Sequence, residues 1–294
     1  MVLSPVCGTI LCIMEGLPNH TNIPEKETAS KRLSLALEAQ MKLTVKEMRL
    51  HGEEHLNAIP EGKKVVIATT HISDIDIPLV AAALSKYFDI AITNMSIHHS
   101  FFAEPSTNIG MRIAGKENFI PIDFNKDEGE KRASFNPDNF EPMAKALDEG
   151  KAIIIAAHNP AHGWALTKGG YGASYLSDIA KGDVVILPVS VNLVSEKPVG
   201  MHESKIKTLT EKPVADIYIN EPIELEKISG IKDLSDIMHK HEKGVRLTPL
   251  ERQRFSELKA TLQSQSDSIM ERLAASLPEE KRGGYKVAED TETM

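Results

Sequence analysis

The sequence predicts an α/β fold in which a mostly parallel central sheet is flanked by helices, with helical extensions at both ends of the chain. Short apolar runs with the character of buried strands alternate with segments of helical periodicity, an order typical of layered α/β domains. Several runs are continuously apolar, which favours strands covered on both faces. A length of 294 residues with 41% apolar residues is enough to bury such a core.

The chain divides into three predicted regions: an N-terminal apolar segment and helix (1–56), an α/β core (57–230) and a C-terminal helical region with a tail (231–294). Leucine and methionine recur among charged residues over 27–50, which predicts a helix there. Pro60 interrupts this pattern before the core begins.

Within the core, the run Val65-Val66-Ile67-Ala68 predicts a buried strand that ends at a loop. The runs KAIIIAA over 151–157 and VVILPVSV over 184–191 predict two further central strands. Gly150 follows a helical segment and is typical of a helix C-terminus. The remaining core elements are predicted as helices over 75–87, 140–147 and 172–179 and strands over 90–95, 119–122 and 215–219.

The C-terminal region begins with a helix-start signal. Thr248-Pro249-Leu250-Glu251 has the capping-box pattern, with proline at the first helical position. We expect a charged amphipathic helix from there to about residue 276, where the sequence SLPEEKRGG ends it.

Charge and cysteine content restrict the partners and the compartment. The net charge of −8 argues against a uniformly basic surface, so no nucleic-acid partner is predicted. The two cysteines, Cys7 and Cys12, fit no zinc spacing, and no metal site is predicted. Without a disulfide framework the compartment is predicted to be reducing, most simply the cytoplasm. No apolar stretch reaches the ~18 residues of a membrane-spanning helix.

The first residues leave two interpretations open. Residues 2–14 are apolar but short, and they lack the basic start of a secretory signal. The segment is either a buried terminal element or a surface that rests on a bilayer. In the second case the protein is peripheral at the inner membrane face, and basic residues contact anionic lipid: Lys31, Arg32, Lys42, Lys46 and Arg49.

The segment Thr70-His71-Ile72-Ser73-Asp74-Ile75-Asp76 carries the chemistry that we predict. His71 sits just past the carboxyl end of a buried strand, where ligand sites of α/β sheets gather, and Asp76 begins the next helix. A bond from one ring nitrogen to Asp76 would fix the tautomer and stabilise the imidazolium, leaving the other nitrogen free to take a proton from a hydroxyl. His71 is therefore predicted as a general base that Asp76 orients.

Alternatives to this pairing stay open at this point. Asp74 is a rival carboxylate at a different spacing, and either aspartate could instead cap the following helix. No G-x-S-x-G nucleophile pattern accompanies the histidine, so the attacking group is predicted to be a substrate alcohol. An esterase or thioesterase, in which water replaces the alcohol, is the least favoured hypothesis because no activated serine is seen.

The order of these motifs resembles the phospholipid/glycerol acyltransferase family, the enzymes that acylate glycerol-3-phosphate and lysophosphatidic acid. His71 and Asp76 match the family's His-x4-Asp pattern, with Ser73 in its usual small polar position. The further blocks that resemble the family in order lie at 115–123, 156–163, 167–189, 220–223 and 277–285. The resemblance covers about residues 60–225 and the tail.

This resemblance implies an acyltransferase that uses acyl-CoA or acyl-acyl carrier protein as co-substrate, needs no bound cofactor, and acts on lipid precursors at a phospholipid surface. The third block departs from the family, with His158 at its acidic position and Ala161 at its arginine. These departures favour an alternative, a catalytically impaired lipid- or acyl-binding scaffold on the same fold. The substrate-binding residues predicted for the enzyme are Arg112, Lys116, His158, Asn159 and Lys168.

Overall fold

The computed structural model describes residues 25–73, 75–94, 115, 118–121, 137–158, 165–195, 212–242 and 245–285. Their strands form one sheet with the order β1-β7-β6-β2-β5-β3-β4, and β8 pairs with β6 beside this path. The strands are β1 (Glu47–His51), β2 (Lys64–Thr69), β3 (Ile90–Asn94), β4 (Phe119–Pro121), β5 (Ala152–Ala156), β6 (Val184–Val194), β7 (Val214–Ile219) and β8 (Ile223–Glu224).

The sheet is mostly parallel, as the sequence predicts. β2 lies between β5 and β6 and runs parallel to both, with Thr69 opposite Ala156 and Val189. β3 pairs in parallel with β5 and β4, and β1 pairs in parallel with β7. Only the pairings of β6 with β7 and β8 are antiparallel among the described strands. The carboxyl ends of β2, β5 and β3 therefore meet at one edge of the sheet.

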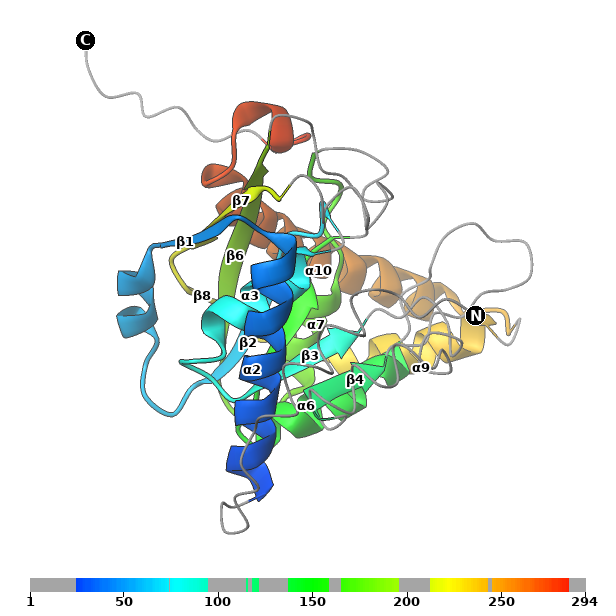
Figure 1. The fold of residues 1–294 in the computed structure, drawn as a ribbon. Helices are drawn as coiled ribbons and strands as arrows, with labels where there is room; N and C mark the ends of the chain where they lie inside the picture. The colour runs from blue at the N-terminus through cyan, green and yellow to red at the C-terminus, as the bar shows by residue number, and fades with distance from the viewer. Residues whose placement is uncertain are drawn as a thin grey trace, which may run out of the picture.

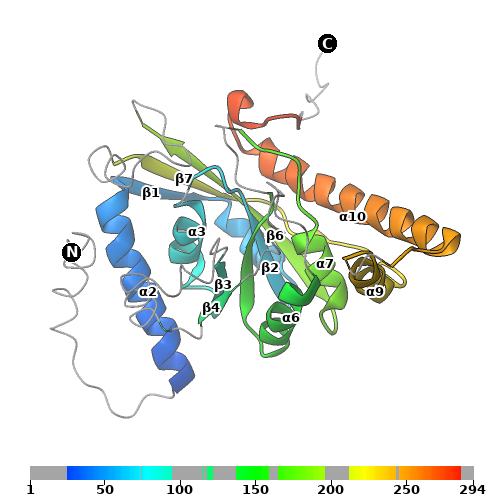
Figure 2. The same cartoon turned by 90° about the vertical axis from the view of Figure 1, so that its right-hand side faces the viewer.

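Helices cover both faces of this sheet (Figures 1 and 2). Figure 2 shows α2 and α3 on one side and α6, α7, α9 and α10 on the other. The helices are α2 (Glu25–Thr44), α3 (Asp76–Leu84), α6 (Phe140–Asp148), α7 (Gly172–Ile179), α9 (Ile231–Glu242) and α10 (Pro249–Ala275). Short 3-10 turns lie at Glu53–Ala58, Pro137–Asn139 and Glu279–Lys281.

Two separate apolar cores explain why the central strands are continuously hydrophobic. Successive side chains of a strand point to opposite faces. Val66 and Ala68 accordingly pack into the core under α6, α7 and α10, while Val65 and Ile67 pack into the core under α2 and α3. Ile67 is fully buried, and a strand between two helical layers has no solvent face that would tolerate a polar residue.

The structure corrects the predicted N-terminal helix. Helix α2 ends at Thr44, and the edge strand β1 (Glu47–His51) takes up residues 47–50, which we predicted as helical. This strand is mostly exposed, so its sequence lacks the apolar signal of the central strands, and its pairing with β7 decides its conformation. Helix α9 lies within the region 231–294 that we predicted as helical, although no bounds were predicted for it, and the two-residue strand β8 was not predicted.

The C-terminal helix confirms its start signal. Thr248 accepts a hydrogen bond from the backbone N–H of Glu251, and the Glu251 side chain accepts one from the backbone N–H of Thr248. Helix α10 then runs to Ala275 and buries Leu258, Leu262 and Ile269 against the sheet. Nowhere in the described part of the chain is a helix both long and apolar enough to span a bilayer.

Candidate active site

The loop that carries His71 is held between the two strands that flank β2. The carbonyl of Thr69 accepts a hydrogen bond from the N–H of Ala157, which follows β5, at 2.8 Å. On the other side, Thr70 donates its backbone N–H to the carbonyl of Val189 at 3.3 Å. The hydroxyl of Thr70 accepts the N–H of Val191 at 3.0 Å. The chain thus enters the loop with its direction fixed from both sides.

The side chain of His158 fixes the backbone of His71. The N–H of His71 donates to Nε2 of His158 at 3.0 Å, although 87 residues separate them in the sequence. An imidazole nitrogen that accepts a hydrogen bond carries no proton, so the proton of the neutral ring lies on Nδ1. That nitrogen lies 3.1 Å from the hydroxyl oxygen of Thr167, which takes the role of acceptor. His158 is 2% exposed and is held as one neutral tautomer.

Asp76 closes the loop from its other end. Its Oδ2 accepts the backbone N–H of Ile72 at 2.7 Å and that of Ser73 at 3.1 Å. Its Oδ1 accepts the hydroxyl of Ser73. Asp76 is the first residue of α3, so its carboxylate also lies at the positive end of the helix dipole. These contacts make Asp76 the residue that folds the segment carrying His71 into a compact turn.

The environment of Asp76 perturbs its ionisation. Burial raises the pKa of Asp76 from 3.8 to about 6. The hydrogen bonds from Ser73 and Ile72, together with the positive charge of Lys281, act in the opposite direction and keep the pKa from rising further. The group is 1% exposed, so solvent screens these interactions little. At pH 7 Asp76 is a buried carboxylate stabilised by donors of its own loop.

The structure brings His71 and Asp76 into one turn at the carboxyl end of β2, where the sequence predicts them. Both side chains are buried, with 9% of His71 and 1% of Asp76 exposed. The described contacts of the Asp76 carboxylate are those to Ile72 and Ser73, so the bond from the His71 ring to this carboxylate stays a prediction. Asp74, the rival carboxylate, lies outside the described residues.

The predicted substrate-binding residues have different outcomes. Arg112, Lys116 and Asn159 lie outside the described residues. Lys168 is exposed near the strand-like bridge between Gly169 and His158. Both ring nitrogens of His158 contact protein groups, His71 and Thr167. Contact of Lys168 or His158 with a substrate therefore stays a prediction.

Sequence reasoning missed two residues of this site, Thr167 and Lys281. The turn Glu279–Lys281 packs against the 165–170 segment, and the carbonyl of Lys281 accepts the N–H of Leu166 at 2.8 Å. The hydroxyl oxygen of Tyr285 accepts the N–H of Gly169 at 2.9 Å. The resemblance of residues 277–285 to a family tail marked this segment, but its position beside the His71 loop depends on the tertiary fold.

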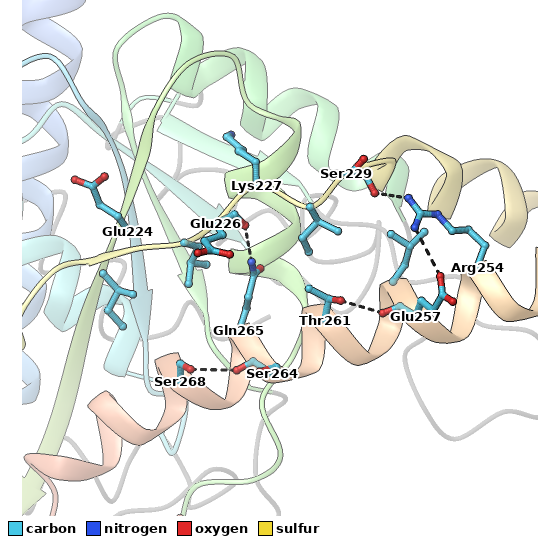
Figure 3. Close-up of a pocket in the computed structure, with 14 residues that line it drawn as sticks. Glu224, Glu226, Lys227, Ser229, Arg254, Glu257, Thr261, Ser264, Gln265 and Ser268 are labelled. Carbon is cyan, nitrogen blue, oxygen red and sulfur yellow. Dashed lines mark hydrogen bonds and ion pairs between the residues drawn. The ribbon is translucent and has the colours of Figure 1, made fainter.

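A separate pocket of about 560 Å3 lies between the segment Ile223–Ser229 and helix α10 (Figure 3). Ile223 pairs with Ile186, near the start of β6, so the pocket is at the opposite end of the sheet from His71. Gln265 donates to the carbonyl of Glu226 at 2.7 Å across it, and Arg254 bonds to the carbonyl of Ser229. Among the described residues no cluster of three His, Cys, Asp or Glu could hold a metal ion.

Comparison with solved structures finds the crystal structure of the 1-acyl-sn-glycerophosphate (LPA) acyltransferase PlsC from Thermotoga maritima. It is 14% identical to this chain, with a TM-score of 0.45, and the match covers 81% of this chain and 87% of that one. No protein-family model and no curated protein matches the sequence.

Proposed function

We propose that the chain is an O-acyltransferase. It moves a fatty acyl group from an acyl thioester, carried by CoA or acyl carrier protein, to an alcohol acceptor such as glycerol-3-phosphate or a lysophospholipid. The observation that supports this most directly is the turn of residues 71–76, which sets a histidine and a buried carboxylate at the carboxyl end of a central parallel strand. The order of sequence blocks that resembles the acyltransferase family supports the same reaction.

In this proposal His71 acts as the general base. Its imidazole takes the proton of the acceptor hydroxyl as the oxygen attacks the thioester carbonyl, and a tetrahedral intermediate forms. The C–S bond then breaks, and the imidazolium returns the proton to the departing thiolate, so that ester and thiol are the products. Such proton transfer contributes roughly 10²- to 10⁴-fold to a rate.

Asp76 contributes negative charge close to the base. Because the carboxylate is held by Ile72 and Ser73, it cannot rotate away when the imidazole becomes charged. A fixed, poorly solvated carboxylate stabilises an imidazolium more than water would, since it need not reorganise during the reaction. The structure of the turn therefore supports a role for Asp76 in stabilising the protonated base.

An acceptor panel tests the proposal. The purified chain is incubated with a labelled acyl thioester and a set of alcohols, and free thiol and labelled ester are measured. Acyl transfer predicts thiol release that depends on the acceptor. Release without an acceptor indicates a thioesterase, and binding of the acyl thioester without release indicates the scaffold alternative.

The role of His71 is tested by His71→Ala, which should lower acyl transfer by roughly 10²- to 10⁴-fold while the protein stays folded. His51→Ala is the matched control, because His51 lies on the edge strand β1. Strands β7 and β6 lie between β1 and β2, the strand that leads to His71. A folded His71→Ala variant with unchanged turnover would refute the assignment.

The same proposal places the protein in the cytoplasm, at the inner membrane face, where lysophospholipids are available. Its support is the apolar character of residues 2–14. Flotation with anionic liposomes, before and after removal of residues 1–20, measures this. Equal partition of the two forms would exclude the segment as the anchor.

A further inference from the structure

The segment 165–170 lies beside the residues that follow β5. Gly170 donates its N–H to the carbonyl of Ala157 at 2.8 Å, and Gly169 forms an antiparallel bridge with His158. These contacts hold the segment next to His158, whose ring accepts an N–H of the loop that follows β2. The position of the segment therefore bears directly on the residue that restrains this loop.

Helix α10 packs closely against the same segment. The hydroxyl of Ser266 donates to the carbonyl of Gly170 at 3.0 Å. A Cβ on Gly169 would overlap that hydroxyl oxygen and would lie 2.7 Å from Cγ of Met270, which is also on α10. Glycine at this position therefore allows the backbone of the segment to lie directly against the helix.

Tyr285 joins the segment to α10 through one hydroxyl. Its oxygen accepts the N–H of Gly169 at 2.9 Å and lies 3.3 Å from Oδ1 of Asp267, on α10. An ionised carboxylate only accepts hydrogen bonds, so the hydroxyl proton points to Asp267. The ring of Tyr285 packs against the core under α6, α7 and α10. The hydroxyl is thus held in one orientation, with its oxygen directed at the 165–170 segment.

Lys281 fixes the chain that carries Tyr285. Its ammonium donates to Oδ1 of Asn192 at 2.6 Å and to the carbonyl of Leu193 at 3.0 Å, near the end of β6. Its own carbonyl accepts the N–H of Leu166 at 2.8 Å. The turn before Tyr285 is therefore attached both to the sheet and to the segment that the tyrosine hydroxyl contacts.

We propose that Tyr285 is a positioning residue of the active site, which acts on His158 through the segment 165–170. Thr167 lies in this segment, 3.1 Å from Nδ1 of His158, while Nε2 of the same ring accepts the N–H of His71. Movement of the segment would let the imidazole of His158 rotate and release that N–H. The role in catalysis rests on the proposed function, whereas the restraint on the loop does not.

Native-state hydrogen exchange tests the restraint without any activity measurement. Tyr285→Phe keeps the aromatic ring and removes only the hydroxyl, so the buried N–H of Gly169 loses its acceptor. The loss of an acceptor by a buried donor corresponds to roughly 5- to 150-fold in a local equilibrium. The amides of Gly169 and His71 should therefore exchange at least ~5-fold faster in Tyr285→Phe than in the native chain at pH 7.5.

Two controls separate this local effect from a general loss of stability. Tyr218→Phe removes a tyrosine hydroxyl from β7, which pairs with β1 and β6. Thr248→Ala removes the capping box at the opposite end of α10 and so weakens the helix without changing a contact of the 165–170 segment. The His71 amide should exchange at least ~5-fold faster in Tyr285→Phe than in either control.

The separate effects on kcat and KM give the second readout. A displaced His71 ring weakens the transition state more than the bound substrate. In Tyr285→Phe, kcat should therefore fall by roughly 5- to 100-fold, while KM for the acceptor changes by less than ~2-fold. Tyr218→Phe should leave both constants unchanged.

Two results overturn the inference. One is exchange of the His71 amide at the same rate in Tyr285→Phe and Thr248→Ala, since the effect would then be general. The other is an unchanged kcat in Tyr285→Phe when the native chain is active. Absence of acyl transfer in the native chain refutes the proposed function, while hydrogen exchange still decides whether Tyr285 restrains the loop.

Discussion

Replacement of His158 is the sharpest test of how the His71 loop is held. His158→Leu keeps an apolar side chain of moderate size at a position that is 2% exposed. It removes the nitrogen that accepts the N–H of His71 at 3.0 Å and the nitrogen beside Thr167 at 3.1 Å. The two amide residues serve as matched variants, because glutamine reaches the position of Nε2 and asparagine reaches that of Nδ1.

The size of the effect follows from these two contacts. A buried donor that loses its acceptor costs about 1–3 kcal/mol, and loss of an ordinary hydrogen bond to a hydroxyl costs about 1 kcal/mol. His158→Leu should therefore lower the free energy of unfolding by about 2–4 kcal/mol. His158→Gln can accept the N–H of His71 and should recover most of the first contribution. His158→Asn reaches only the Thr167 side and should recover less than His158→Gln.

Urea unfolding at pH 7.5 measures these differences, with the slope of the transition compared between variants to check that two-state behaviour is kept. Native-state hydrogen exchange of the His71 amide locates the effect in the loop, since this amide should exchange faster in His158→Leu than in His158→Gln. Turnover should follow the same order, because a loop that moves displaces the His71 ring.

Two results would refute this reasoning. If the free energies of unfolding of His158→Leu and His158→Gln agree within ~0.5 kcal/mol, an acceptor for the N–H of His71 does not contribute to stability. Unchanged exchange of the His71 amide in His158→Leu would mean that the hydrogen bond to His158 does not restrain the loop.

Three further predictions follow from single residues. The pKa of Asp76 is about 6 in the folded chain and 3.8 in the unfolded chain. Between these pH values the folded chain therefore binds more protons than the unfolded chain. The free energy of unfolding should fall by up to ~3 kcal/mol as pH rises through this range. Asp76→Asn should remove this fall and unfold at higher urea than the native chain above pH 7; a fall of the same size in the variant would contradict it. Gly283→Ala should cost at least ~1–2 kcal/mol in urea unfolding, because φ at Gly283 is +61° and an added Cβ would lie 2.0 Å from the carbonyl oxygen of Leu166. Gly284→Ala is the control and should cost much less, because the space around Gly284 is open. Thr248→Ala should cost ~0.5–2 kcal/mol in urea unfolding through loss of the capping box. Thr261→Ala, on the exposed face of α10, should be near neutral in the same measurement.

The elements that the sequence predicted well are those whose signal is local and strong. Ile67 and its neighbours on β2 are buried on both faces, so the strand reads as an unbroken apolar run. Thr248 and Glu251 mark the start of α10 because a capping box involves only residues three apart. β1 escaped prediction because an exposed edge strand carries little apolar signal, and its structure depends on β7, more than 160 residues later.

The sequence by itself determined the α/β class and the place of His71 and Asp76, because both residues belong to one short segment after one buried strand. Only the tertiary structure decided what surrounds that segment. His158, which follows β5, contacts His71, which follows β2. Lys281, in the turn after α10, reaches Asn192 near the end of β6. These approaches depend on strand order and on the path of the C-terminal segment, and no periodicity or spacing in a single sequence encodes which distant side chains such packing brings together.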